Sequence, residues 1–404
     1  MKTAIIGGGA SGMMCAALLL EKGADITVFE KTGRCGRKLS ITGKGRCNLT
    51  NNCSKDEFFS SVASNPRFLY SSYSLFSSAD TMDFFERRGV PLKTERGNRV
   101  FPVSDSARDV TDALFRDVRK TVRYEEVLSV KKTDGACFEI KTALKTYAFD
   151  NAVIATGGLS YPLTGSTGDG YRFARSNGLS ITPTRGSLVP LASPSPDCAR
   201  MTGLSLKNVA LTIFDGNKKV YSDFGEMLFT HFGISGPMVL SASAVIGDPK
   251  DGNYTASIDL KPALDEKELD TRLLRDFSQN INRDFGNSLG GLLPSKMTDV
   301  FTDRTGIPGN KKIHSVTRAE RERIIGLLKS FTVPISGFRP VSEAIVTRGG
   351  VSVSEINPKT MEARKVPGLY FIGEVLDVDA FTGGFNLQIA FSTAAACARA
   401  LSGD

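Results

Sequence analysis

Residues 5–12 read Ile-Ile-Gly-Gly-Gly-Ala-Ser-Gly, and this turn constrains the fold of the 404-residue chain more than any other segment. A short apolar stretch, residues 3–6, leads into the glycines, and a helix-forming run, 13–21, follows them. A second apolar stretch, 26–29, ends directly before Glu30. The order strand, glycines, helix, strand and acid predicts a βαβ unit that binds a dinucleotide.

Each glycine of this Gly-x-Gly-x-x-Gly fingerprint has a physical task. Gly7 permits a tight turn, Gly9 lets the backbone approach a pyrophosphate, and Gly12 lets the helix pack closely on the strand. The helix N-terminus attracts the phosphates, and Glu30 is placed to accept hydrogen bonds from a ribose diol. A plain glycine-rich turn is the alternative, but it explains neither the strands nor the acid. The position of the fingerprint at the start of the sequence is typical of flavin enzymes, so we expect the dinucleotide to be FAD.

A long basic loop, residues 31–54, follows the ribose-binding acid. From Arg34 to Lys55 the sequence contains six basic residues and no acid, among several glycines. Such a loop can wrap the FAD phosphates and reach toward the flavin, although a solvated basic loop is the alternative. Cys47 lies in this loop and is the candidate proton donor; the alternative is a buried cysteine that packs the loop.

Two further glycine-rich segments complete the expected cofactor site. Residues 155–158 read Ala-Thr-Gly-Gly, and a strand ending in this way lets the backbone pass close beside a cofactor, with a plain β-turn as the alternative. Residues 373–379 precede a Gly-Gly turn at 383–384, after which a helix would aim its N–H groups at the pyrimidine edge of a flavin. We expect Asp379 to lie near the ribityl chain, with helix caps or ion pairs as the alternative role for the acids of this segment. The residues expected to bind the cofactor are Gly7, Gly9, Ala10, Ser11, Gly12, Glu30, Lys31, Arg37, Lys38, Val127, Thr156, Gly157, Gly158, Gly373, Glu374, Asp379, Gly383, Gly384, Phe385 and Asn386.

The rest of the chain predicts an α/β protein with an insertion. Residues 55–119 are expected to be helical with a break at 91–102, and 122–130, 137–142 and 146–149 to form a three-stranded meander. The expected domains are an FAD-binding domain (1–187 and 351–404), a β-rich inserted domain (188–261 and 331–350) and a helical domain (262–330).

Composition limits the partners. The net charge is +8, which permits a polyanionic partner such as RNA, although a merely basic surface is the simpler explanation. The seven cysteines form no Cys-x-x-Cys pair and there are only two histidines, so we expect no metal site and a reduced, cytoplasmic chain. No apolar run near the start is long enough to span a membrane, and no signal peptide is seen. Oligomeric state is left open.

The strings at residues 43–51, 225–237, 347–351 and 373–379 together resemble the BaiN/RdsA family of NAD(P)/FAD-dependent oxidoreductases, also known as aminoacetone oxidase-like flavoproteins. The resemblance spans the whole chain, although Gly-Gly-Phe-Asn stands at 383–386 where the family has Gly-Gly-Tyr-Asn or a close variant. It implies a Rossmann-type FAD domain, an inserted β-barrel-like domain and a small helical domain.

The resemblance also implies flavin redox chemistry with three kinds of substrate. Hydride transfer from reduced flavin to an activated C=C bond would reduce a 3-oxo-Δ4 bile acid or steroid enone, or convert uracil in large-subunit ribosomal RNA to dihydrouridine. The alternatives are a small-amine (aminoacetone) oxidase that produces hydrogen peroxide, and a non-catalytic flavin-carrying RNA-binding factor. Because no second glycine fingerprint appears, we expect NAD(P)H to dock transiently as electron donor; the alternative is that oxygen or a protein exchanges electrons with the flavin.

For an RNA substrate, the expected phosphate contacts are Lys44, Arg46 and Arg348. For a steroid substrate, Phe232, Ile234 and Met238 are expected to line an apolar pocket, although they are equally suited to a core.

Overall fold

The computed structural model describes residues 1–133, 137–249, 253–279 and 281–403. The chain divides into two compact units. Unit 1 comprises Met1–Ser187 and Pro340–Asp404, and unit 2 comprises Leu188–Arg339. Each unit has its own buried hydrophobic cluster. The candidate cofactor residues all belong to unit 1.

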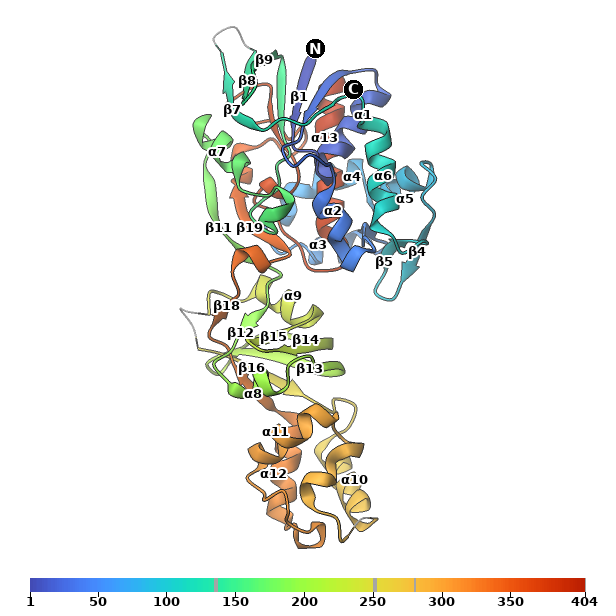
Figure 1. Ribbon diagram of the computed structural model, residues 1–404, viewed down its shortest axis with the longest axis vertical. Coiled ribbons are helices and arrows are strands. Elements are labelled where there is room, and N and C mark those ends of the chain that lie inside the picture. Colours follow the sequence, from blue (N-terminus) through green and yellow to red (C-terminus); the bar gives the residue numbers. More distant parts are fainter. Residues whose placement is uncertain (134–136, 250–252, 280, 404) are drawn as a thin grey trace. The chain divides into compact units, whose positions relative to one another are not determined.

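The centre of unit 1 is a five-stranded sheet in the order β20-β10-β1-β2-β6, in which every neighbouring pair is parallel (Figure 1). Short buried runs such as Ala-Ile-Ile and Ala-Val-Ile fit strands that are covered on both faces. Because the strands are parallel, their carboxyl ends lie at one edge of the sheet, where ligands bind in folds of this type. The strands are β1 (Lys2–Ile6), β2 (Asp25–Phe29), β6 (Val122–Arg123), β10 (Asn151–Ile154) and β20 (Leu369–Phe371).

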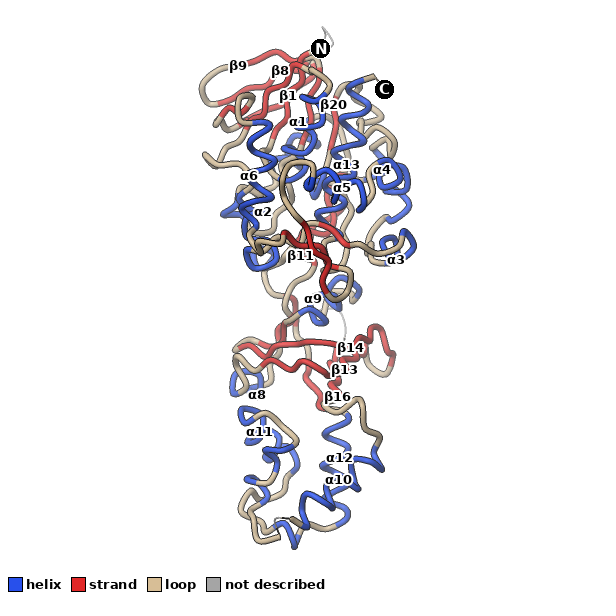
Figure 2. The backbone as a smooth tube through the Cα atoms, turned by 90° about the vertical axis from the view of Figure 1, so that its right-hand side faces the viewer, coloured by secondary structure: helices blue, strands red, loops and turns tan. Residues whose placement is uncertain are grey.

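Two helices that are far apart in the sequence pack together against this sheet. The contact joins α1 (Ala10–Glu21) and α13 (Phe385–Ser402), which lie side by side in Figures 1 and 2. Both helices are apolar nearly all round, and the run Ala-Ala-Ala-Cys in α13 lets the neighbouring backbone approach closely. The predicted βαβ unit and the predicted C-terminal helix are therefore confirmed.

Smaller elements surround this core. A three-stranded antiparallel meander confirms the one predicted, although its first strand starts at Val127 and the preceding β6 joins the parallel sheet instead. The remaining elements of unit 1 are α2 (Arg37–Ile41), β3 (Thr50–Asn51), α3 (Lys55–Ser60), α4 (Tyr70–Leu75), α5 (Ser78–Glu86), β4 (Leu92–Glu95), β5 (Arg99–Pro102), α6 (Ala107–Val118), β7 (Val127–Lys132), β8 (Phe138–Thr142), β9 (Thr146–Phe149), α7 (Asp169–Ser176), β11 (Ile181–Ser187) and β19 (Val346–Val351), together with several single-turn 3₁₀ helices.

Unit 2 combines a seven-stranded sheet, in the order β17-β16-β13-β14-β15-β12-β18, with five α-helices and three short 3₁₀ helices among its described residues. Its helices and its sheet share one hydrophobic cluster, so the helical segment is continuous with the sheet's core. The elements are β12 (Leu191–Ala192), α8 (Pro196–Arg200), β13 (Ser205–Asp215), β14 (Lys218–Thr230), β15 (Gly233–Ser235), α9 (Pro237–Val245), β16 (Tyr254–Asp259), α10 (Glu266–Ser278), α11 (Ser295–Thr305), α12 (Arg318–Lys329), β17 (Phe331–Pro334) and β18 (Gly337–Phe338).

Three details differ from expectation. The break predicted at 91–102 is a β-hairpin, β4–β5, whose strand β5 pairs with β3. The segment 31–54 is not wholly a loop, because it contains α2 and a 3₁₀ turn, η1 (Thr42–Gly45). Residues 340–350, which we expected in the insertion, belong to unit 1 because β19 pairs with β11.

Within the described part of the chain, no helix combines the length and apolar character that a membrane crossing requires.

Candidate functional site

The carboxyl edge of the parallel sheet gathers the predicted site segments. The chain leaves this edge into the glycine turn after β1, into Glu30 after β2 and into Thr156 after β10. It leaves the same edge toward Gly373 after β20, and toward Val127, which is buried at the start of β7, after β6. The parallel topology therefore explains why residues more than 300 positions apart converge on one place.

The glycine turn has room for no other residue at two of its three fingerprint positions. Gly7 has φ of +110°, and a Cβ there would overlap the backbone of Ala155. A Cβ on Gly12 would overlap the carbonyl oxygen of Gly7. These overlaps match the tight turn and the close helix–strand packing expected of the two glycines.

Gly9 is different, because a Cβ added there meets no atom of the described chain within 4 Å. Gly9 is the N-cap of α1, which begins at Ala10 with no side-chain cap and no acid in its first turn. A helix start with unpaired N–H groups beside open space is suited to an anion, since the helix dipole favours negative charge there. The turn therefore fits the pyrophosphate of a dinucleotide.

The carboxylate of Glu30 is held against the same turn. Its Oε2 accepts a hydrogen bond from the Gly8 N–H at 2.9 Å, and its Oε1 accepts from the N–H and the hydroxyl of Thr32, each at 2.7 Å. Glu30 is only 9% exposed. A buried acid fixed at this position is suited to binding a ribose diol.

Ser11 and Gly373 connect the first and last segments of the site. Gly373 has φ of +75°, and a Cβ there would lie 2.5 Å from the Ser11 hydroxyl. Its N–H donates to the Thr393 hydroxyl of α13 at 3.0 Å. The chain after β20 is thus held between the two packed helices.

Lys38 and Glu374, predicted separately as cofactor residues, pair with each other. Lys38 Nζ lies 2.6 Å from Glu374 Oε2 and 2.7 Å from the Ser160 hydroxyl. Glu374 Oε1 accepts from the Ser160 hydroxyl at 2.8 Å and from the Thr347 N–H at 2.9 Å. This network ties α2 to the segments after β10 and β20.

Replacing Lys38 by Met should leave Glu374 partly buried without its cation. We expect a loss of about 1–3 kcal/mol in the free energy of unfolding, measured by urea denaturation. The matched control is Arg87→Met, which breaks the exposed i,i+4 pair with Asp83 and should cost less than about 0.5 kcal/mol. Equal losses in the two variants would contradict a structural role for the Lys38–Glu374 pair.

Of two other predicted basic residues, one is paired and half-buried and the other is exposed. Lys31 Nζ lies 2.5 Å from Asp169 Oδ2. Burial acts to raise the pKa of that carboxyl, but its hydrogen bonds and the charge of Lys31 together outweigh burial, so the pKa is lowered. Arg37 is exposed at the start of α2.

The Thr-Gly-Gly segment after β10 is fixed by Thr347, whose role the sequence did not reveal. The hydroxyl of Thr347 accepts from the N–H groups of Leu159 at 2.7 Å and Ser160 at 3.1 Å, and a Cβ on Gly158 would overlap it. Gly157 adopts φ of +70° in the same turn. Only glycine therefore fits at position 158 without a shift of Thr347.

The turn before α13 is shaped by two glycines with positive φ. Gly383 has φ of +131° and Gly384 has φ of +99°, and a Cβ on Gly384 would overlap the backbone of Thr50. Asn386 fastens the turn, accepting from the Ala380 N–H at 3.0 Å and donating to its carbonyl at 2.7 Å. No side chain caps this N-terminus of α13, so its N–H groups can face a polar ring edge.

Phe385 and Asp379 lie on either side of this turn and are both buried. Phe385 packs against the ring of Phe58, with centroids 6.0 Å apart. The two carboxylate oxygens of Asp379 accept from the hydroxyls of Ser64 and Ser187, the latter at 2.6 Å. Asp379 thus has a structural role in the chain, and its contact with a ribityl group stays a prediction.

Two asparagines of the string 43–51 were not singled out as site residues. The side-chain carbonyl oxygens of Asn48 and Asn51 are buried and have no hydrogen-bond partner within the described residues. The same holds for the hydroxyl of Thr156. Asn51 Nδ2 donates to the carbonyl of Gly383 at 2.9 Å. Buried acceptors without partners favour a bound polar group, because leaving them unpaired costs free energy. Their place in the string 43–51 was the available signal.

Cys47 is fully buried and has φ of +60°. Burial raises the pKa of its thiol to about 12, although a hydrogen bond with Thr42 acts in the opposite direction. The thiol therefore keeps its proton at neutral pH, which is compatible with both a proton donor and a packing residue.

The expected substrate contacts are partly corrected. Arg46 is not a free cation, because it forms ion pairs with Glu95 and Asp105. Ile234 and Met238 are buried in the hydrophobic cluster of unit 2, in accordance with the core alternative. Phe232 is half-buried with the guanidinium of Arg339 over its ring at 4.4 Å, whereas Lys44 is exposed.

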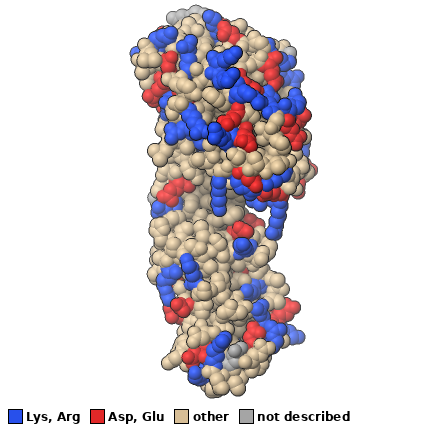
Figure 3. All heavy atoms as spheres, turned by 45° about the vertical axis from the view of Figure 1, so that its right-hand side comes forward, with Lys and Arg blue, Asp and Glu red and all other residues tan. Residues whose placement is uncertain are grey.

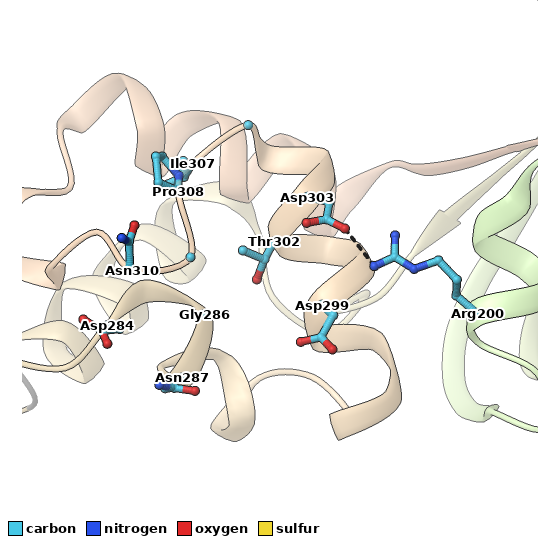
Figure 4. A pocket seen from close by; sticks show the side chains of 12 residues that line it. Arg200, Asp284, Gly286, Asn287, Asp299, Thr302, Asp303, Ile307, Pro308 and Asn310 are labelled. Atoms are coloured by element: carbon cyan, nitrogen blue, oxygen red, sulfur yellow. Dashed lines mark hydrogen bonds and ion pairs between the residues drawn. The ribbon is translucent and has the colours of Figure 1, made fainter.

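A pocket of about 670 Å³ lies in the helical part of unit 2 and contains none of the predicted site residues. Figure 4 shows Asp299, Thr302 and Asp303 of α11 around it, with Asp303 bonded to Arg200 at 2.7 Å. Three aspartates line this pocket, so it suits neither an apolar enone nor a phosphate. Throughout the described ranges, no group of His, Cys, Asp and Glu side chains is arranged to hold a metal ion.

Known proteins match the chain from end to end. The family model described as HI0933-like protein Rossmann domain matches residues 1–400. A ribosomal RNA dihydrouridine synthase of Escherichia coli (strain K12) is 35% identical over 401 residues, which is 98% of this chain and 97% of that protein. A second ribosomal RNA dihydrouridine synthase, from Haemophilus influenzae, is 31% identical and covers 98% of both chains.

A 3-dehydro-bile acid delta(4,6)-reductase of Clostridium scindens is 30% identical over 403 residues, again 98% of both chains. Among solved structures, a 3-ketosteroid delta1-dehydrogenase from Sterolibacterium denitrificans superposes with a TM-score of 0.51 at 12% identity, covering 99% of both chains. That likeness shows the fold alone. The predicted family and the Rossmann-type fold are confirmed.

Proposed function

Because the chain belongs to the HI0933-like family of Rossmann-fold, flavin-dependent oxidoreductases, we propose that it reduces an activated C=C bond in the uracil rings of ribosomal RNA. The observation that carries the proposal is the end-to-end match at 35% identity to a ribosomal RNA dihydrouridine synthase. The net charge of +8 accords with a polyanionic substrate. Such a substrate would place the chain in the cytoplasm, where its seven free cysteines would stay reduced.

The residues present fit FAD. The α1 N-terminus and the space at Gly9 would hold the pyrophosphate, and Glu30 would hold a ribose. The N-terminus of α13, with the unpaired oxygen of Asn51 nearby, would hold the pyrimidine edge of the flavin. When bound, FAD supplies a two-electron hydride carrier, which we propose is recharged by NADH or NADPH.

The chain's own residues supply orientation and a proton. Reduction of a C=C bond adds a hydride to one carbon and a proton to its neighbour, so a donor that is protonated at neutral pH is required. The thiol of Cys47 stays protonated at neutral pH because burial raises its pKa, and Cys47 directly precedes Asn48, whose buried side-chain oxygen has no partner within the described residues. We propose Cys47 as this donor.

Replacing Cys47 by Ala should lower kcat for dihydrouridine formation by about 100-fold or more and leave the bound flavin in place. Turnover is measured on deproteinised ribosomal RNA, and flavin content from the visible spectrum. Cys198→Ala, which removes a buried thiol of unit 2, is the matched control. Unchanged turnover in the Cys47 variant would restrict that thiol to packing.

Product analysis separates the candidate reactions. The purified chain with FAD and NAD(P)H is offered deproteinised ribosomal RNA, a 3-oxo-Δ4 steroid, or aminoacetone with oxygen. We expect dihydrouridine in the digested RNA, an unchanged steroid and no hydrogen peroxide. A saturated steroid or peroxide without dihydrouridine would reject the RNA proposal. RNA binding with no product from any substrate would favour the non-catalytic, flavin-carrying alternative.

A further inference from the structure

The β4–β5 hairpin ends in a three-residue loop, Arg96-Gly97-Asn98, between the paired residues Glu95 and Arg99. Gly97 and Asn98 both adopt positive φ, +75° and +58°, which shapes the tight turn. Arg96 and Arg99 are exposed on either side of the turn. The loop therefore presents two guanidinium groups at its tip.

Asn51 holds this tip beside the candidate flavin site. Its Nδ2 donates to the carbonyl of Gly97 at 3.0 Å and to the carbonyl of Gly383 at 2.9 Å. The Asn52 N–H also donates to the carbonyl of Asn98 at 2.7 Å. A single side chain thus separates the hairpin tip from the turn that starts α13.

Ion pairs within the chain neutralise two of the basic residues near the hairpin. Arg46 and Lys93 share Glu95 and Asp105, with Lys93 2.8 Å and Arg46 2.5 Å from the oxygens of Asp105. These two cations and two anions cancel, and the guanidinium of Arg46 also lies 4.2 Å from the ring centre of Phe101. The network anchors η1 to the hairpin.

Three cations near this network are left over. Lys44 at the tip of η1, Arg96 and Arg99 are exposed, and none has an ion pair with an acid within the described residues. Over the face drawn in Figure 3, basic and acidic side chains are interspersed. Exposed cations that are unpaired within the chain remain available to a polyanion.

We propose that Lys44, Arg96 and Arg99 form a phosphate-binding rim that grips the RNA backbone next to the base being reduced. The inference rests on the proposed function and adds the surface by which this chain would recognise RNA. A small amine gains nothing from three cations without acidic partners at the rim of the site, and a bile acid offers them a single carboxylate, whereas a phosphodiester chain offers a negative charge at every nucleotide. The rim replaces Arg46 as the phosphate contact expected from sequence.

The test compares Arg96→Ala/Arg99→Ala with Arg119→Ala in the full-length flavoprotein. Arg119 is also exposed, but it lies at the far end of α6 from the hairpin. The helix starts on the hairpin side, and its 12 residues span about 18 Å from that start to Arg119. Binding of a fluorescent, uridine-containing single-stranded RNA is measured against salt concentration. We expect the double variant to lower the slope of log K against log salt by about 1.4, roughly 0.7 for each lost phosphate contact, and Arg119→Ala to leave it unchanged.

The steady-state kinetics on deproteinised ribosomal RNA should agree, with KM raised in the double variant and kcat and flavin content retained. If the unmutated chain forms dihydrouridine while the double variant matches Arg119→Ala in slope and KM, the rim is rejected and the proposed function stands. If the unmutated chain neither binds RNA nor forms dihydrouridine, both are rejected.

Discussion

A Gly9→Val variant should fold normally and fail to retain FAD. A Cβ added at Gly9 meets no atom of the described chain within 4 Å, and Gly9 has an ordinary φ of −82°, so the backbone is not strained. The added side chain would instead occupy the space that we assign to the pyrophosphate. We expect FAD affinity to fall by about 100-fold or more, equivalent to about 2.8 kcal/mol, with the free energy of unfolding of the apoprotein lowered by no more than about 1 kcal/mol.

The measurement pairs the visible spectrum after gel filtration with thermal unfolding of the apoprotein. Gly290→Val is the matched control, because Gly290 in unit 2 likewise has open space around it. That variant should keep the flavin. A Gly9→Val protein that purifies with a full complement of FAD would contradict the assignment of the β1–α1 turn.

The Gly384→Ala variant should lose both stability and activity. Its methyl group would overlap the backbone of Thr50, and φ of +99° disfavours any residue with a Cβ. Either β3 or the start of α13 must move, and the first would carry Asn51 with it. We expect a loss of about 3 kcal/mol or more in the free energy of unfolding, since the strain of about 1–2 kcal/mol adds to the overlap, and a large fall in kcat.

The control is the glycine at the other end of the same helix. Gly403 follows α13 with φ of +76° and nothing within 4 Å of an added Cβ, so Gly403→Ala should cost only the backbone strain, about 1–2 kcal/mol. Urea denaturation and turnover are measured for both variants. If the two variants lose the same free energy of unfolding and both keep full activity, the close approach of β3 to the start of α13 is not required for activity.

The local parts of the site could be predicted from sequence because each is continuous in the chain. The fingerprint, Glu30, the Thr-Gly-Gly turn and the Gly-Gly turn before α13 all lie where short motifs place them. The parallel sheet then brings these segments together, and its topology follows from the alternation of short apolar strands with helices.

The parts that could not be predicted depend on long-range pairing. Arg46 was expected to bind phosphate, but its partners Glu95 and Asp105 are 49 and 59 residues away in the sequence. The β4–β5 hairpin was missed because its charged residues show no strand alternation, and pairing with β3 stabilises it instead. Ile234 and Met238 could not be assigned to core or pocket from hydrophobicity alone, since both environments favour the same residue types.

The most direct test of the proposed reaction is an anaerobic titration of the purified flavoprotein. The flavin spectrum is first bleached with NADH or NADPH, and deproteinised ribosomal RNA is then added without oxygen. The proposal predicts that the oxidised spectrum returns and that the digested RNA contains dihydrouridine in proportion. A spectrum that stays bleached with RNA, but recovers with a 3-oxo-Δ4 steroid, would contradict the proposal and make the chain a steroid-type enone reductase.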